Sequence, residues 1–453
     1  MVARWHHRVS DVQLVLFVLA IGLLGHFYFF FQSPEHYLYD SKEYLAAMRS
    51  LITRHEFLDA AGRVEVRRTP GYPLFLVPFS LLRASVVQTV AAQHLLAVAL
   101  AVAVQLAAWR ASGSRALGLY AGLLVALDPG LIFAANVIMT ETVASVLLFA
   151  TALILGQGKG PRSLIGNGAA GLLCGAAYLV RPIVAYLWIP LTLWLLFERR
   201  TGEEPVPMRI RSVAVFVLAA LLLPTGWSYR NRVRTGSAAV SSIALEDLYY
   251  WRAASAEATA QTGFVYAMLP DSTAEDAYRS LFIRTVQRDY SRRLDVELRA
   301  VAGERGQALS LHERDAVEAA MAWKIIFGHP WATFLMTLNG ALHFIFDSAW
   351  PFASQAVGSL VRTPLLYLQS LLSIAEFPLA IIGWFFLRRR AQRTASVIAI
   401  VLLYFLAVGS GPEQEQWRYR IPVIPLYVVL VAGGIEALRL KRMAPRSPTP
   451  VNA

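Results

Sequence analysis

The sequence contains very little cysteine and little charge. Cys174 is the one cysteine among 453 residues, and it lies within an apolar stretch. A single thiol excludes an intrachain disulfide framework and a metal site built from several cysteines. Charged residues make up 16% of the chain, whereas soluble domains carry roughly 25%. This deficit argues against an ordinary soluble enzyme.

Several familiar catalytic signatures are also missing. The chain has no HExxH motif, no Walker motif and no zinc-ligand spacing. One literal GxGxxG match begins at Gly166, but it opens an apolar segment with no strand before it, which is not the context of a dinucleotide site. Gly171 and Gly175, four residues apart, instead predict close packing between membrane helices.

Apolar residues are abundant, at 56% of the chain, and they occur in long runs. The first run, Val12 to Phe31, has about the 20 residues needed to cross a bilayer. Arg4 and Arg8 precede it, which places the N-terminus in the cytoplasm. No small-residue cleavage site follows, so we interpret the run as a retained anchor rather than a signal peptide. The net charge of +12 then fits basic cytoplasmic loops rather than nucleic-acid binding.

The runs predict an all-α polytopic membrane protein of about 10–12 transmembrane helices, with amphipathic helices and a mainly helical domain on the outer face. The expected crossings are 12–31, 86–109, 116–127, 136–155, 164–180, 183–197, 212–227, 363–387, 395–408 and 421–438. Leu74 to Leu82 is too short to cross and is interpreted as re-entrant or interfacial. Trp331 to Trp350 is interpreted as partly buried or re-entrant. This alternation places both termini in the cytoplasm.

The chain divides into four parts. Residues 1–227 form an N-terminal transmembrane catalytic module with a first outer loop at 32–69, and 228–330 an extracytoplasmic helical domain. Residues 331–438 form the C-terminal transmembrane helices, and 439–453 a basic cytoplasmic tail. Within the helical domain, 274–290 and 311–327 are amphipathic, and the latter begins with a capping-box pattern at Ser310 and Glu313. These helix faces are too apolar for a disordered linker.

Some charged residues fall on the outer face, where short loops otherwise carry few basic residues. They are Asp40, Arg67, Arg68, Arg181, Arg230 and the run Arg418-Tyr419-Arg420. Because they depart from the usual distribution, they are the candidates for a functional site.

Asp40 is the candidate general base. Helical spacing places Tyr37, Asp40, Tyr44, Ala47, Met48 and Leu51 on one face, and Lys42, Glu43 and Arg49 elsewhere. Burying a carboxylate on such an aromatic face is costly unless it is paired. A base there could activate an acceptor hydroxyl. A helix N-cap is the alternative role, because Asp is common at that position.

The arginines are candidates for binding a phosphate. Arg67 and Arg68 could bind phosphate oxygens bidentately and stabilise a phosphate leaving group, or they could extend toward lipid headgroups. Adjacent residues of an extended segment point to opposite sides, so we expect only one to face a site. Arg418 and Arg420 begin the last crossing with Tyr419, where a helix N-terminus also favours anions. An interfacial aromatic and basic belt is the alternative.

Further candidates lie at the ends of other crossings. Glu141 begins one at the outer face, so its carboxylate must be paired or hydrated. Arg181 ends another, because Pro182 blocks helix continuation; an interface anchor is the simpler role for this arginine. Tyr44, Tyr72 and Tyr419 are candidate supporting residues.

The order of several short motifs resembles a known family. They are YDSKEYL, RRTPGYPLFL, MTETVAS, YLVRP, WSYRNRVRTG, LSLHERDAVEAAMAWKIIFGHP and WRYRIPVIPL, running from about Tyr37 to Leu438. This order resembles bacterial C-type membrane glycosyltransferases related to the protein O-mannosyltransferases and lipid A aminoarabinose transferases. The resemblance implies a polyprenyl-phosphate sugar donor, a reaction outside the cytoplasmic membrane and inversion at the anomeric carbon.

The resemblance also implies roles for particular residues. Asp40 is similar to the family's proposed catalytic base, and Arg67 or Arg68, Arg181, and Arg418 or Arg420 would surround the lipid phosphate. The protein mannosyltransferases often have Asp-Glu where this chain has Asp40-Ser41, which puts a protein acceptor in doubt.

The partners that follow are a polyprenyl-phosphate sugar, a lipid, glycan or protein acceptor, and the membrane, without nucleic acid. No cofactor is implied with certainty, and a divalent cation stays open. A transporter or flippase of lipid-linked sugars is the main alternative, although such proteins usually place charges near the bilayer midplane and contain internal repeats. Two further alternatives are a polysaccharide ligase or polymerase and a structural membrane protein. An enzyme requires Asp40 and the arginines to converge.

Overall fold

The computed structural model describes residues 10–33, 36–38, 40–157, 163–198, 206–262, 289–305, 308–346, 359–411 and 416–443. Throughout these residues the regular structure is helical, apart from one isolated antiparallel bridge between Leu58 and Val64. The all-α fold class predicted from the sequence is therefore confirmed.

The described helices follow one another in chain order. They are α1 (Asp11–Gln32), α2 (Ser41–Arg54), α3 (Gly71–Leu81), α4 (Val86–Ser112), α5 (Arg115–Ala126), α6 (Pro129–Asn136), α7 (Glu141–Gln157), α8 (Ser163–Val180), the 3-10 helix η3 (Pro182–Val184), α9 (Trp188–Phe197), α10 (Val206–Thr235), α11 (Ile243–Glu246), the π-helix η4 (Asp247–Ala253), α12 (Ala254–Thr262), α14 (Ser291–Arg305), α15 (Leu311–Gly328), α16 (Pro330–Phe346), α18 (Ser359–Arg390), α19 (Gln392–Gly409), α20 (Gln416–Arg420), the 3-10 helix η7 (Ile421–Val423) and α21 (Ile424–Met443).

Six of the described helices are long and apolar enough to span a membrane: α1, α4, α10, the Leu371–Arg390 part of α18, α19, and Arg418–Met443. The pair α5 and α6, bent by 45°, is a seventh candidate span. Helices α7, α8 and α9 are apolar but shorter, and together with the seven they occupy the ten positions where crossings are expected. Helix α3 has 11 residues, fewer than the roughly 20 needed to cross, and α16 has 17.

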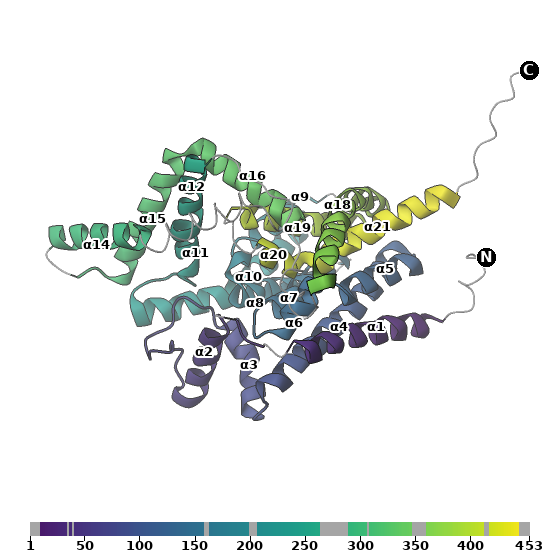
Figure 1. Ribbon diagram of the computed structural model, residues 1–453, viewed down its shortest axis with the longest axis horizontal. Coiled ribbons are helices and arrows are strands. Elements are labelled where there is room, and N and C mark those ends of the chain that lie inside the picture. The colour runs from purple at the N-terminus through teal and green to yellow at the C-terminus, as the bar shows by residue number, and fades with distance from the viewer. Residues whose placement is uncertain are drawn as a thin grey trace, which may run out of the picture.

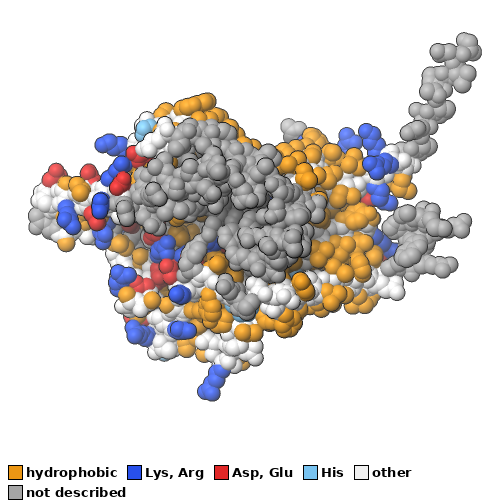
Figure 2. All heavy atoms as spheres, in the orientation of Figure 1, with side chains coloured by type: hydrophobic (Ala, Val, Ile, Leu, Met, Phe, Trp, Pro, Cys, Tyr) orange, Lys and Arg blue, Asp and Glu red, His pale blue; other side chains and the backbone are white. Residues whose placement is uncertain are grey.

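The bundle has two distinct ends (Figure 1). The first residues of α1 and the last residues of α21 lie at one end, whereas α14, α15, α2 and α3 lie toward the other. On the face shown in Figure 2, hydrophobic side chains cover much of the bundle, and most charged side chains gather toward the end with α14 and α2. This separation is what a bundle embedded in lipid, with a polar part outside it, requires.

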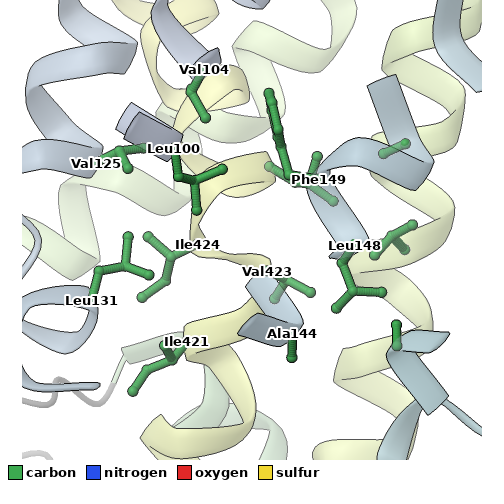
Figure 3. Packing of buried hydrophobic residues seen from close by; sticks show 14 of the residues in the cluster. Leu100, Val104, Val125, Leu131, Ala144, Leu148, Phe149, Ile421, Val423 and Ile424 are labelled. Atoms are coloured by element: carbon green, nitrogen blue, oxygen red, sulfur yellow. The ribbon is translucent and has the colours of Figure 1, made fainter. Parts of the chain in front are cut away.

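The core of the bundle brings together helices that are far apart in the sequence. Leu100 of α4, Leu131 of α6 and Ile424 of α21 gather in one part of Figure 3, and Leu148 of α7 belongs to the same buried cluster. Each is almost fully buried, so the last membrane helix packs directly against the first half of the chain.

Two glycines allow α8 and α10 to approach closely. A Cβ at Gly171 would collide with the carbonyl oxygen of Phe216, and one at Gly175 with that of Ala220. Small residues permit such backbone contact between membrane helices. The predicted packing role of this glycine pair is confirmed, and the GxGxxG match lies within a helix.

Helices η4, α12, α14 and α15 have a hydrophobic core of their own. Tyr249, Tyr290 and Leu294 pack there with Ile326, and the Tyr249 hydroxyl donates to the Tyr290 carbonyl at 3.1 Å. The predicted capping box is confirmed, because Glu313 accepts from the Ser310 backbone N–H at 2.8 Å and the Ser310 hydroxyl accepts from that of Glu313. Most of the amphipathic stretch 274–290 lies outside the described residues. The domain boundary expected after residue 227 falls inside α10, which continues to Thr235.

Candidate functional site

Asp40 occupies the residue before α2, but its side chain does not cap the helix. Its backbone is already helical, with φ −69° and ψ −25°, and no side-chain capping hydrogen bond forms. The carboxylate instead pairs with the Arg68 guanidinium, with 2.5 Å between Oδ1 and Nη2. The N-cap alternative is therefore not the role that this carboxylate has in the structure.

The helical face predicted around Asp40 is only partly correct. Tyr44, Ala47 and Met48 are buried on α2, as expected. The helix begins at Ser41, however, so Tyr37 precedes it and is 50% exposed. The prediction from helical spacing therefore begins the helix about one turn too early.

The loop before α2 is attached to the connection between α6 and α7. The Ser41 hydroxyl donates to the Ile138 carbonyl at 2.9 Å and accepts from the Leu38 backbone N–H at 2.8 Å. The Ile138 N–H in turn donates to the His36 carbonyl at 3.0 Å. These bonds fix Asp40 on a rigid part of the bundle, as a catalytic group requires.

Two arginines hold the Asp40 carboxylate from different segments. Arg68 contacts Oδ1, and Nη2 of Arg418 lies 3.4 Å from Oδ2. Arg68 is only 6% exposed. Burial by itself lowers its pKa, but the neighbouring Tyr44, Asp40 and Glu43 outweigh this and raise the pKa above its ordinary value. Arg68 therefore keeps its charge.

Glu141 forms the second half of the cluster. It is 2% exposed and accepts from Nη1 of Arg181 at 2.8 Å and from Nε of Arg418 at 3.0 Å. Arg181 also donates to the Thr140 hydroxyl at 2.9 Å, and its guanidinium lies 5.6 Å from the centre of the Tyr419 ring. Arg418 therefore bridges the two carboxylates, and Arg181 is paired with Glu141.

Arg67 faces a different direction from Arg68, as expected for neighbouring residues. It is 40% exposed and pairs with Glu43 at 2.9 Å and with Glu246 at 2.6 Å. Glu43 also pairs with Arg68, so both arginines meet this one carboxylate. Arg68, and not Arg67, contacts Asp40.

Sequence reasoning missed two of the three glutamates in this network, Glu43 and Glu246. Glu43 was expected on another face of α2, yet it joins the cluster because it lies three residues after Asp40, a spacing that places side chains side by side on a helix. That spacing was a usable signal. Glu246 lies 179 positions from Arg67, and no local pattern marks it.

Arg420 and Arg230 lie against other partners. Arg420 donates to the Ile345 carbonyl at 2.8 Å and pairs with Glu376 at 3.3 Å. Arg230 donates to the Glu65 and Phe57 carbonyls at 3.2 and 2.9 Å, and so braces the loop between α2 and α3. Neither has a described contact with Asp40.

Two buried tyrosines support the cluster. The Tyr44 hydroxyl accepts from Nη1 of Arg68 at 3.4 Å. The Tyr72 hydroxyl donates to Oε1 of Gln93 at 2.8 Å, and the two tyrosine rings meet edge to face at 5.1 Å. Within the described residues, no group of three or more His, Cys, Asp and Glu side chains is placed to hold a metal ion.

The arrangement combines the Asp40 carboxylate, which is 13% exposed, with several fixed positive charges. A carboxylate in this setting can accept a proton from a hydroxyl. Arginines held by neighbouring carboxylates are preorganised to stabilise charge that develops on a phosphate oxygen. The carboxylate base and the arginines that bind an anion can therefore act in the same reaction.

Comparisons with known proteins gave matches among solved structures. No protein-family model matches the chain, and no curated protein matches its sequence. The crystal structure of ArnT from Cupriavidus metallidurans bound to undecaprenyl phosphate is similar at 13% identity and a TM-score of 0.43, over 95% of this chain and 78% of that one. The apo form of ArnT gives 14% identity and a TM-score of 0.39, over 93% and 76%.

A second solved protein is also similar. It is the archaeal oligosaccharyltransferase AglB from Archaeoglobus fulgidus, in complex with an inhibitory peptide and a dolichol-phosphate. The identity is 11% and the TM-score 0.43, over 98% of this chain and 53% of AglB. All three TM-scores are below 0.5, so the residues of the charged cluster, and not these likenesses, support an assignment of function.

Proposed function

We propose that this protein is a membrane glycosyltransferase that transfers a sugar from a polyprenyl-phosphate donor to an acceptor at the outer face of the cytoplasmic membrane, with inversion. One observation carries the proposal. Asp40, from the first outer loop, meets Arg68 of the same loop and Arg418 at the start of the last membrane helix. A base and phosphate-binding groups are what this reaction needs at one place.

The chemistry is a single displacement. Asp40 accepts the proton of an acceptor hydroxyl as its oxygen bonds to the anomeric carbon. The bond between that carbon and the phosphate oxygen breaks, and its electron pair leaves with the polyprenyl phosphate, which gains one negative charge. Attack from the face opposite the leaving group inverts the anomeric configuration. The arginines stabilise the added charge.

The contacts suggest how the arginines divide these tasks. Arg68 is paired on both sides, by Asp40 and Glu43, and we assign it to holding the base. Arg418 and Arg181 share Glu141, and we assign them to the donor phosphate. A phosphate on their side is separated from the Asp40 carboxylate by the Arg418 guanidinium, which reduces the repulsion between the two anions.

Two other arginines that the sequence predicts as phosphate ligands do not contact Asp40 or Glu141 in the described contacts. Arg67 faces Glu43 and Glu246, and Arg420 faces Glu376. Their predicted contact with donor phosphate would require them to exchange these partners.

A polyprenyl chain cannot leave the bilayer, so its sugar must be met at the membrane surface. The charged cluster lies where several apolar helices begin or end: α7 begins at Glu141, α8 ends just before Arg181, and the last candidate span begins at Arg418. We propose that this level is the outer surface of a bacterial inner membrane, with both termini on the cytoplasmic side.

The test is donor turnover by purified protein in lipid nanodiscs. Undecaprenyl-phosphate sugars of several types are supplied with cell-envelope acceptors, and free undecaprenyl phosphate is measured. We expect release with at least one donor, with the inverted anomeric configuration in the product. Movement of an intact donor across vesicle membranes, without release, would instead favour the flippase.

A further inference from the structure

A cavity of about 500 Å³ lies between the end of α10, the following loop and α15. Four residues of α15 line one side: His312, Asp315, Ala316 and Ala319. This volume is within the range of about 300–1,000 Å³ typical of small-molecule sites. We refer to it as the α15 cavity.

The residues of α15 divide into two functional faces. Val317, Met321 and Ile325 pack against the core of the outer helices. The residues facing the α15 cavity follow the spacing i, i+3, i+4 and i+7, so they form one stripe along the helix. That stripe combines two polar side chains with two alanines, and it has no large apolar side chain to bury against a neighbouring helix.

The lining suits a sugar. Arg232 and His312 supply donors, and the Ser237 hydroxyl, 3.4 Å from Oδ2 of Asp315, belongs to a pair that can both donate and accept. Ala238 and Ala316 add small apolar surfaces. A pyranose ring presents hydroxyl groups at its edge and C–H groups on its faces, and it matches both kinds of surface.

The backbone of the loop that lines the cavity is already in use. The Ser228 hydroxyl donates to the Ala238 carbonyl, and Nδ2 of Asn231 donates to the Ala239 carbonyl at 2.8 Å. The Ala239 N–H donates to the Ser237 hydroxyl. An extended peptide recognised through main-chain pairing would need such groups. This favours a saccharide over a peptide.

The same loop is bonded to the segment that holds the base. The Ser241 hydroxyl donates to the Arg67 carbonyl at 2.5 Å, and the Ser242 N–H to the Val66 carbonyl at 3.0 Å. Arg68 follows directly in the chain and pairs with Asp40. Ala239 in the wall of the α15 cavity is therefore two residues from Ser241, which bonds to the segment that orients the catalytic carboxylate.

We propose that the α15 cavity binds a saccharide portion of the acceptor, which rests on the glycosyltransferase function proposed above. Arg232, His312 and Asp315 would bind its hydroxyl groups, and the alanines would contact its ring. The saccharide can belong to a glycolipid or to a water-soluble glycan, because the lining recognises only the sugar.

Two alanines of α15 provide a matched test. Ala316 is exposed and lines the cavity, whereas Ala320 is exposed and does not. Ala316→Trp fills the space for the sugar, and Ala320→Trp adds the same side chain on another face. Each full-length variant is checked for folding by size exclusion and thermal unfolding. Asp315→Ala serves as a second cavity variant if Ala316→Trp does not fold.

Transfer is measured with three acceptor probes: a purified cell-envelope glycolipid, the soluble oligosaccharide released from it, and a peptide rich in Ser and Thr. We expect Ala316→Trp to raise the KM for a glycan probe by about tenfold or more, with a smaller change in kcat, because the binding space is occupied. Ala320→Trp should match the wild type. Comparison of the two glycan probes identifies whether the lipid is needed.

Two results would overturn the inference while leaving the proposed function intact. One is a wild-type KM in Ala316→Trp or, if that variant does not fold, in Asp315→Ala. The other is use of the peptide with neither glycan. Failure of the wild-type protein to release undecaprenyl phosphate from any donor would overturn the proposed function, and the inference with it.

Discussion

Asp40 and Arg418 are 378 positions apart in the chain, yet Oδ2 of Asp40 lies 3.4 Å from Nη2 of Arg418. Through its Nε, Arg418 also contacts Glu141 at 3.0 Å. The start of the last membrane helix is thus joined to both the residue before α2 and α7. Opposite ends of the sequence complete a single charged cluster, which local sequence patterns do not reveal.

Arg418 should be more important for donor binding than Arg420. Arg418→Ala is expected to weaken binding of an undecaprenyl-phosphate sugar by about tenfold or more, because it removes a planar donor that contacts two carboxylates in the cluster. Arg418→Lys should restore this only in part, since a point charge cannot bridge two partners. Arg420→Ala, which removes a contact to Glu376, should have the smaller effect. Equal effects, measured by donor titration, would contradict this assignment.

Glu141 should be essential for stability. Glu141→Gln leaves Arg181 and Arg418 without their shared charge in a buried setting. Removing one partner of a buried pair costs roughly 3–5 kcal/mol. Glu56→Gln is the control, because Glu56 pairs with Arg234 where both are exposed, and such pairs contribute about 0–1 kcal/mol. Thermal unfolding in detergent compares them, and similar losses would mean that the buried cluster adds no special stability.

Glu318, on α15 outside the membrane helices, should make stability depend on pH. Burial, together with the nearby Glu246 and Asp315, raises the pKa of its carboxyl to about 7. The folded state then binds this proton more tightly than the unfolded state. The contribution of protonated Glu318 to folding stability is therefore present below the ordinary pKa of a glutamate and is lost as pH rises through about 7.

Between pH 5 and 8, ionisation of Glu318 should lower the free energy of unfolding of the wild type by about 1 kcal/mol, after solvent screening of this partly exposed group. Glu318→Gln should remove this part of the fall. Glu297→Gln, at an exposed position of α14, is the control. Unfolding measured at both pH values checks this, and an unchanged slope in Glu318→Gln would rule out the effect.

Membrane topology can be tested by labelling single cysteines. Cys174 is buried, so it is replaced by alanine before cysteine is introduced elsewhere. Lys42→Cys and Arg299→Cys should react with an impermeant maleimide added outside intact cells, because we place α2 and α14 on the outer side. Arg389→Cys should react only after permeabilisation. Labelling of Lys42→Cys only from the cytoplasm would refute the proposed orientation of the site.

Local patterns predicted the helices well, because apolar runs, the Ser310 capping box and the Gly171 and Gly175 pair each depend on neighbouring residues. The site was predicted less completely. Which charge pairs with which depends on how distant segments pack, so the contact of Arg67 with Glu246 could not be foreseen. The start of α2 was misplaced because helical spacing alone cannot show where a loop ends.

The most direct test of the proposed mechanism is turnover by Asp40→Asn. Asparagine keeps the size and some hydrogen bonding to Arg68 but cannot accept the proton. We predict a folded protein that still binds donor and turns over about a hundredfold or more slowly, the range for losing a general base. Asp59→Asn, in the same outer loop, should turn over normally. Near-wild-type release of undecaprenyl phosphate by Asp40→Asn would contradict the assignment of Asp40 as the base.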